Sequence, residues 1–150
     1  MDDPILHAPC GYHCGVCPYL MAYKDNDEKL KKKLAKSLGV KEGDIKCEGC
    51  ISDNPFFYCQ HCSLKKCVQK RGITSCVDCD EFPCKKVERF PAKEFIKKVK
   101  WDVNFQKQYG KEKWISKTIE LNTCAECNTL NHWQAKVCKS CGYELKEKNY

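Results

Sequence analysis

The most constraining stretch of this chain runs from residue 124 to residue 142 and reads CAECNTLNHWQAKVCKSCG. It holds two C-x2-C pairs separated by ten residues, Cys124/Cys127 and Cys138/Cys141. Two thiolates separated by two residues in a tight turn can point at one metal ion, and two such pairs joined by a short hairpin can surround a tetrahedral zinc ion. Because all four positions are cysteine, no coordination position is left for water, and we expect a structural rather than a catalytic site.

The turn after the second pair supports the same interpretation. Residues 137–145, VCKSCGYEL, resemble the second knuckle of a zinc ribbon, and Gly142 lets the backbone amides turn toward the sulfurs. We therefore predict a four-cysteine zinc ribbon over residues 122–150. His132 lies in the loop between the pairs, where the full ligand shell leaves it no role as a ligand. Trp133, beside it, is a candidate contact for a partner.

Metal ligation is predicted along most of the chain, which has 15 cysteines in 150 residues. Eleven of them lie between residues 10 and 84, as four further C-x2-C pairs and three singles. Four pairs can combine two by two in three ways, and the spacing does not choose among them. Cys59 is the weakest predicted ligand, because Cys62 and Cys67 alone can supply the two ligands from this part of the chain. The predicted metal ligands are Cys10, Cys14, Cys17, Cys47, Cys50, Cys59, Cys62, Cys67, Cys76, Cys79, Cys84, Cys124, Cys127, Cys138 and Cys141.

A disulfide framework is the main alternative, and three observations oppose it. The N-terminal residues MDDP have neither the basic nor the apolar stretch of a secretory signal. An odd number of cysteines leaves a thiol unpaired, and cysteines two residues apart close loops too small to stabilise a fold. We therefore expect metal binding in a reducing cytoplasm. No run of about 18 apolar residues occurs, so we expect no membrane span.

The composition favours a fold that metal ions stabilise. Hydrophobic residues make up 42% of the chain only because cysteine is counted among them, so the core is thin and folding is expected to depend on metal. We predict a small, irregular α+β or helix-rich fold organised around two or three zinc ions. Its expected parts are a cysteine-rich metal-binding domain (1–90), a helical connector (91–121) and the zinc ribbon (122–150).

Several helices are expected from periodicity and capping. Leucines at every fourth position predict a helix that is capped by Asn26 or Asp27 and ends at Gly39. Residues 8–23 form a glycine-rich opening, and residues 41–62 are expected to be irregular. Further helices are expected over residues 63–71, from about Cys84 toward Phe90, from Pro91 as first helical residue up to Gly110, and around residues 114–119.

Four cysteine blocks in the first part of the chain resemble a known family. They read CGYHCGVCPY, CEGC, CSLKKC and KRGITSCVDCDEFPC. Their order over about residues 8–90 is similar to that of the prokaryotic family catalogued as domain of unknown function 3795. The resemblance implies a small cysteine-rich, zinc-binding protein without an assigned reaction, and it does not extend to Cys59. The ligand positions that it implies are Cys10, Cys14, Cys17, Cys47, Cys50, Cys62, Cys67, Cys76, Cys79 and Cys84.

Iron–sulfur chemistry is the alternative for the N-terminal cysteines. A redox or electron-transfer protein would hold a cluster there, although the ferredoxin run C-x2-C-x2-C-x3-C-P is absent. Cys10, Cys14 and Cys17 have a spacing that resembles radical S-adenosylmethionine enzymes. Those enzymes build a partial or full β/α barrel, a full one needs about 250 residues, and they carry an aromatic residue where this chain has Val16. Thiol-based sensing through a reactive Cys59 is a third possibility.

The charge and the motifs point away from several function classes. The formal charge is +7, but three zinc ions held by four thiolates each would reduce it to about +1, so basicity is weak evidence for a nucleic-acid partner. Walker, Rossmann, H-E-x-x-H and G-x-S-x-G motifs are absent. We expect a non-enzymatic zinc-binding adaptor or binding module. A protein partner is slightly favoured over nucleic acid, with contacts through residues 55–58 (PFFY) or Trp133.

Overall fold

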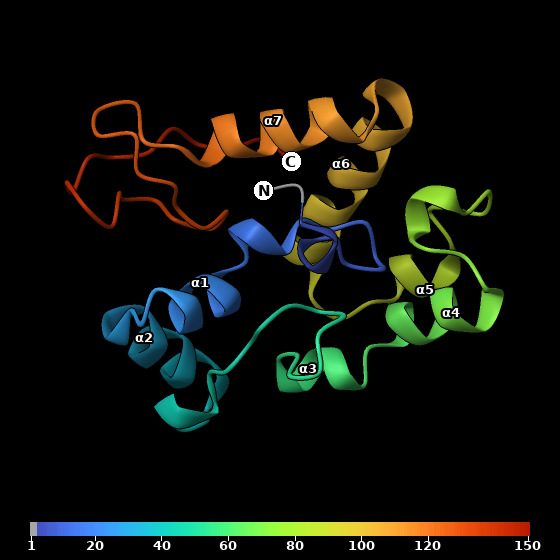
Figure 1. The fold of residues 1–150 in the computed structure, drawn as a ribbon, viewed down its shortest axis with the longest axis horizontal. Helices are drawn as coiled ribbons and strands as arrows, with labels where there is room; N and C mark the ends of the chain where they lie inside the picture. The colour runs from blue at the N-terminus through green and yellow to red at the C-terminus, as the bar shows by residue number, and fades with distance from the viewer. Residues whose placement is uncertain (1–2) are drawn as a thin grey trace.

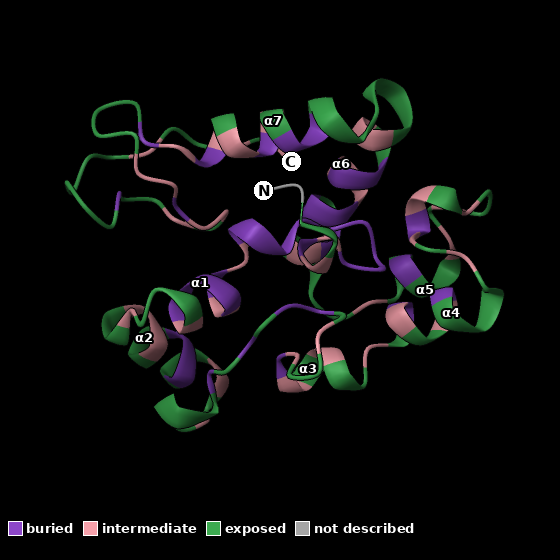
Figure 2. Cartoon of the chain, viewed as in Figure 1, coloured by how far each residue is buried: buried purple, intermediate pink, exposed green. Residues whose placement is uncertain are grey.

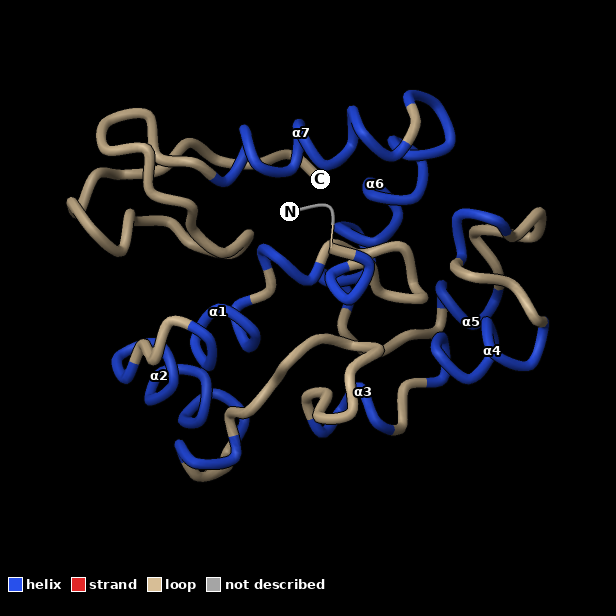
Figure 3. The backbone as a smooth tube through the Cα atoms, viewed as in Figure 1, coloured by secondary structure: helices blue, strands red, loops and turns tan. Residues whose placement is uncertain are grey.

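The computed structural model describes residues 3–150; Met1 and Asp2, of the N-terminal residues MDDP, lie outside the described residues. The described chain is mostly helical (Figures 1 and 3). Its α-helices are α1 (Pro18–Lys24), α2 (Glu28–Leu38), α3 (Phe57–Gln60), α4 (Ser63–Arg71), α5 (Lys85–Glu88), α6 (Lys93–Tyr109) and α7 (Lys111–Asn122). Short 3-10 helices are η1 (Pro4–Leu6), η2 (Cys14–Val16), η3 (Glu42–Asp44) and η4 (Cys76–Asp78).

Strand pairing is slight. Among residues 3–150 it is confined to isolated antiparallel bridges, which join His7 to His13, Thr123 to Leu130, and Val137 to Glu144. The small, mostly helical character is therefore confirmed, whereas the β part of the predicted α+β class is not. No helix among the described residues is both long enough and apolar enough to cross a bilayer.

The helix with the clearest sequence signals forms as predicted. Asp27 caps α2 by accepting a 3.0 Å hydrogen bond from the Leu30 amide, which satisfies one of the free donors of the first turn. Gly39 ends the helix in the left-handed region at φ 69°, and the amide of Val40 then reaches back to the carbonyl of Ala35. The predicted helix over residues 63–71 is also present, as α4.

Two predictions about helices need correction. The glycine-rich opening hides α1, in which Pro18 occupies the first turn, a position that suits proline because its missing amide needs no partner there. The helix expected from Pro91 begins at Lys93 instead, with Ala92 as its cap. Pro91 is exposed and precedes the helix, since the chain first turns between α5 and α6.

The core lies where the N-terminal loops meet α6 and α7 (Figure 2). Val16, Val99 and Val103 are fully buried there. The loop at Gly11 passes so close to α6 that an added Cβ would stand 2.5 Å from Cγ2 of Val103, and Gly11 has a φ of +88°. The side chain of Gln106 donates to the Gly11 carbonyl at 2.8 Å, which holds the loop on the helix.

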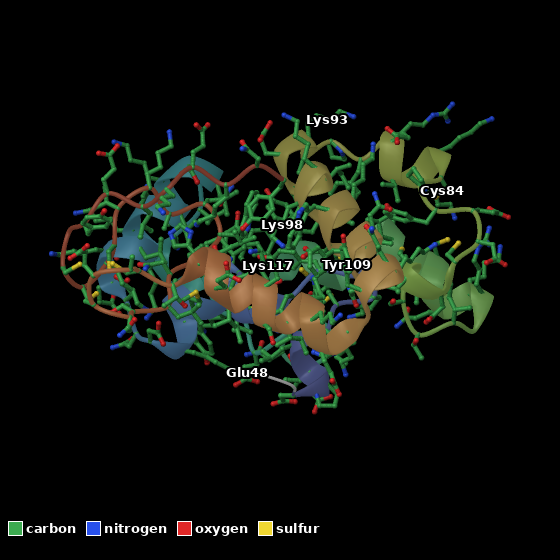
Figure 4. The ribbon with its side chains drawn as sticks, turned by 90° about the horizontal axis from the view of Figure 1, so that it is seen from above. Glu48, Cys84, Lys93, Lys98, Tyr109 and Lys117 are labelled. Atoms are coloured by element: carbon green, nitrogen blue, oxygen red, sulfur yellow. The ribbon has the colours of Figure 1, made fainter. Side chains whose placement is uncertain are left out.

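A buried ion pair lies within α6. Lys98 and Asp102 are both 0% exposed, and their side chains form an ion pair of 2.5 Å. Figure 4 places Lys98 in the interior of the molecule. Its ammonium lies 4.8 Å from the ring centre of Trp101 and 4.7 Å from that of Tyr150, so aromatic faces supply part of the stabilisation that water would give.

The C-terminal segment packs on the rest of the molecule. The amide of Trp133 donates to the carbonyl of Val16 at 3.0 Å, and Lys139 forms an ion pair of 2.6 Å with Asp25. At the chain's end, the ring of Tyr150 lies edge-on to Trp101. The predicted boundaries at residues 90 and 121 stay predictions, and contacts cross both of them.

Candidate metal centre

Two matching loops carry the C-terminal cysteines. The first follows the bridge residue Thr123: the amide of Cys124 donates to Thr129, and the amide of Asn128 returns to Cys124, both at 2.9 Å. The second loop repeats this pattern, because the amide of Cys138 donates to Tyr143 at 2.8 Å and that of Gly142 returns to Cys138 at 3.0 Å.

A left-handed residue closes each of these loops. Asn128 has φ 58° and Gly142 has φ 75°, and each directly follows the second cysteine of its pair. Asparagine and glycine are the residues that adopt this conformation most readily. The role predicted for Gly142 in turning the chain is consistent with this geometry, and Asn128 plays the same part in the first loop.

The two loops bring four sulfurs together. The Sγ atoms of Cys124 and Cys141 lie 3.7 Å apart, and those of Cys127 and Cys138 lie 3.6 Å apart. All four sulfurs lie within 4.8 Å of one another. With Zn–S bonds of about 2.3 Å, the edges of a tetrahedral four-thiolate site measure about 3.8 Å. The arrangement can therefore hold one metal ion with four thiolate ligands.

Neighbouring groups stabilise negative charge on the sulfur of Cys138. Asn131 is 1% exposed, and its side-chain amide donates to Sγ of Cys138 at 3.6 Å while its carbonyl oxygen accepts from the Lys139 amide. The Cys141 amide first, then the Ser140 amide and Asn131, lower the pKa of Cys138 to about 6. Hydrogen bonds of this kind orient thiolate ligands and tune a metal site.

The sequence pattern did not single out Asn131, because an asparagine seven residues before the second knuckle belongs to no recognised motif. Its position between two ligand pairs, where a polar side chain can reach a sulfur, is the one signal for it. His132 is half-buried, and burial, followed by the charges of Lys148 and Lys33, lowers its pKa to about 4. The expectation that His132 is not a ligand agrees with the composition of the cluster.

Nine of the eleven N-terminal thiols lie in or against the core, and seven of these form one group. Four of these seven, Cys10, Cys14, Cys47 and Cys50, are less than 9% exposed. Burial, followed by the neighbouring thiols, raises the pKa of Cys14 well above its ordinary value. The members of this group are Cys10, Cys14, Cys17, Cys47, Cys50, Cys59 and Cys62, and burial followed by neighbouring thiols raises the pKa of Cys10 as well.

The other four N-terminal thiols, Cys67, Cys76, Cys79 and Cys84, belong to α4, η4 and the start of α5. Within residues 3–150, the C-terminal cysteines are the one set of three or more candidate ligands whose donor atoms all lie within 4.8 Å of one another. Metal ligation by the eleven N-terminal cysteines therefore stays a prediction.

The two histidines beside predicted ligands have other surroundings. His13 is 0% exposed, and its Nδ1 accepts a 3.0 Å hydrogen bond from the Gly15 amide, so it caps η2. The His13 ring also packs 5.2 Å from that of Trp114 on α7. His61 is exposed.

Comparison with known proteins identifies one family. The family model described as "Protein of unknown function (DUF3795)" matches residues 6–89, which is more than half of the chain. The matched region contains all eleven N-terminal cysteines, and the C-terminal cysteine cluster lies outside it. No curated protein and no solved structure matches the chain.

Proposed function

The chain belongs to the DUF3795 family of proteins of unknown function, and from this premise we propose that it is a zinc-binding protein that works without catalysis, as an adaptor or binding module. The observation that supports zinc is the C-terminal cluster, whose four sulfurs have the spacing that one tetrahedral ion requires. Four thiolates fill the shell, so the ion would fix the two loops and would have no position for a substrate.

A protein partner is the favoured occupant of the exposed surface. Tyr58 is 58% exposed, and beside it a groove of about 390 Å³ is lined by Val40, Pro55, Phe57 and residues around them. Exposed aromatic rings next to a concave surface are common anchors for protein partners. Phe56, by contrast, is 2% exposed and stacks on Tyr19 with ring centres 4.1 Å apart, so it supports this surface from below.

Metal analysis is the experiment that tests this proposal. Protein purified without oxygen should contain zinc, and the Cys124→Ser/Cys127→Ser variant should lose one zinc per chain. A matched control is Ser116→Ala on the exposed face of α7, which should leave the zinc content unchanged. A purified chain whose C-terminal thiols bind no zinc, even after zinc is supplied under reducing conditions, would overturn the proposal.

The salt dependence of binding separates the two classes of partner. A nucleic-acid complex weakens steeply as salt rises, because phosphate contacts release counterions. Retention of an interacting protein from 50 to 300 mM salt, and its loss in the Tyr58→Ala variant, is the result expected for a protein partner. Steeply salt-dependent binding of RNA or DNA by the wild-type chain would contradict this preference.

Iron–sulfur chemistry is a second candidate for the N-terminal domain. The observation that favours it is the gathering of seven thiols in and around the core, more than the four that one zinc ion uses. Thiolates on a polynuclear cluster bind different metal atoms and therefore stand farther apart than thiolates on one ion. Brown protein with equal amounts of iron and sulfide would support this candidate, and colourless protein with zinc alone would exclude it.

A further inference from the structure

Three short elements meet at the end of the molecule far from the C-terminal cluster. Helix α4 carries Cys67 and Arg71 one turn apart, and α5 begins directly after Cys84 and packs on α4. Between them in the chain, the turn of η4 carries the pair Cys76 and Cys79. Figures 1 and 4 show α4, α5 and Cys84 on the opposite side of the molecule from the C-terminal segment.

The turn that carries this pair is held in a fixed shape. Ser75 caps it by accepting from the Val77 amide at 3.0 Å, and the amide of Cys79 donates to the carbonyl of Cys76 at 3.3 Å. Two further hydrogen bonds attach the turn to the core. The Cys76 amide donates to Pro9 at 2.7 Å, and the ammonium of Lys107 on α6 donates to the Cys79 carbonyl at 2.8 Å. The pair is therefore pre-positioned in a way that an ordinary surface loop is not.

The guanidinium of Arg71 links the turn to α4. Its Nη1 lies 3.8 Å from Sγ of Cys79, and its Nη2 pairs with Glu81 at 2.6 Å. A guanidinium that donates to a metal-bound sulfur forms a charge-assisted hydrogen bond, which is stronger than a neutral one. Its positive charge also offsets part of the double negative charge that a divalent ion with four thiolates carries.

The thiol of Cys76 is 8% exposed, and Cys84, at the start of α5, is partly buried against the same core. Cys67, Cys79 and Cys84 are half-exposed, which gives their side chains room to turn toward a common ion.

We propose that a second four-thiolate zinc site lies here, with Arg71 donating to the sulfur of Cys79 from outside the ligand shell. Its ligands are Cys67, Cys76, Cys79 and Cys84. Cys62 is left out because it lies at the N-cap of α4, at the opposite end of that helix from Arg71. The spacing of the N-terminal cysteines leaves several sets of four open, and this proposal chooses one of them. It does not depend on the C-terminal zinc site.

Thiol labelling of the wild-type chain tests the site. Zinc-loaded protein is given a short pulse of N-ethylmaleimide, before and after zinc is removed with a strong chelator, and labelled peptides are measured by mass spectrometry. We expect Cys67, Cys79 and Cys84 to label at least ten times faster after removal, although all three are half-exposed in the fold. Equal labelling rates in both samples would overturn the proposal.

The exposed Cys127 and Cys141 of the C-terminal cluster serve as an internal reference. If they respond to zinc and the three α4–α5 cysteines do not, the second site fails while the proposed function stands. The reverse pattern would retain the second site and overturn the C-terminal one.

Zinc counting by native mass spectrometry covers the case in which chelation unfolds the chain. Cys76→Ser/Cys79→Ser should carry one zinc fewer than wild type, and combining it with Cys124→Ser/Cys127→Ser should remove two. A full zinc count in the first variant overturns the proposal.

Arg71→Gln tests the role of the guanidinium. We expect it to keep the zinc but to release it to a chelator about ten times faster, since groups that hydrogen-bond metal ligands have effects of that size. Lys70→Gln removes the same charge from the neighbouring exposed position and should release zinc at the wild-type rate. Equal release from both variants would assign the effect to net charge and remove Arg71 from the site.

Discussion

The indole Nε1 of Trp114 donates a 2.7 Å hydrogen bond to Oδ1 of Asp102, deep in the contact between α7 and α6. The same oxygen accepts from the ammonium of Lys98. The Asp102 carboxylate thus accepts hydrogen bonds from a fully buried tryptophan and a fully buried lysine. Burial is the largest effect on the pKa of Asp102, and it raises that pKa. A buried ion pair adds little net stability, yet breaking one half of it is strongly destabilising.

We therefore expect a non-additive result from substitutions in this pair. Asp102→Leu alone should lower the free energy of unfolding by about 3–5 kcal/mol, because it leaves the Lys98 ammonium buried without a counter-ion. The double variant with Lys98→Met should be more stable than Asp102→Leu alone. Chemical denaturation of the zinc-loaded protein measures both values, and equal stabilities of the single and double variants would contradict the expectation.

Gly11 offers a second test, of close packing. In Gly11→Ala the new methyl group would meet Val103 at a distance that no real contact has, and the φ of +88° adds backbone strain. We expect a loss of about 2–4 kcal/mol. Combining it with Val103→Ala should lose less than the sum of the single changes, because the clash is relieved. Gly43→Ala, where nothing lies within 4 Å, is the matched control and should be nearly neutral.

Asn131 is expected to control how tightly the C-terminal site holds its ion. Asn131→Asp keeps the size and the acceptor for Lys139 but replaces the donor to Cys138 with a negative charge. Transfer of zinc to a chelator should become about ten times faster. The same substitution at the exposed Asn104 on α6 should change nothing, and a similar acceleration there would point to a general charge effect.

The pH dependence of stability should carry a contribution from His132. Its folded pKa of about 4 lies below its ordinary 6.5, so the unfolded chain binds the proton more readily. This contribution is present above about pH 6.5 and is lost as pH falls toward 4. His132→Gln should therefore lose stability less steeply than wild type over this range in parallel urea titrations. Acid release of zinc affects both proteins, so the difference between them is the quantity to compare.

The predictions from sequence succeeded where local chemistry decides the outcome. Asp27 and Gly39 bound α2 because a side-chain acceptor and a left-handed glycine act within one turn of the helix. The spacing from Cys124 to Cys141 predicted a cluster because each loop needs only its own hydrogen bonds and one left-handed residue.

Features that depend on contacts between distant parts of the chain could not be predicted from the sequence pattern. Arg71 meets Cys79 only because the turn of η4 lies beside the end of α4, and Gly11 must be glycine only because Val103 lies against it. For the same reason the grouping of the N-terminal thiols could not be read from C-x2-C spacing. The start of α6 was placed early because proline at the first helical position is a preference, which the turn before Lys93 overrides.

The hydrogen bond from the Trp133 amide to the Val16 carbonyl brings the chain back to its start. After leaving the N-terminal core and passing along α6 and α7, the chain contacts Val16, which lies between Cys14 and Cys17. Mechanical load applied to the C-terminal loops would therefore reach η2 directly, without passing back through the helices. A partner that binds and reshapes the last thirty residues would therefore act directly on the group of N-terminal thiols around η2.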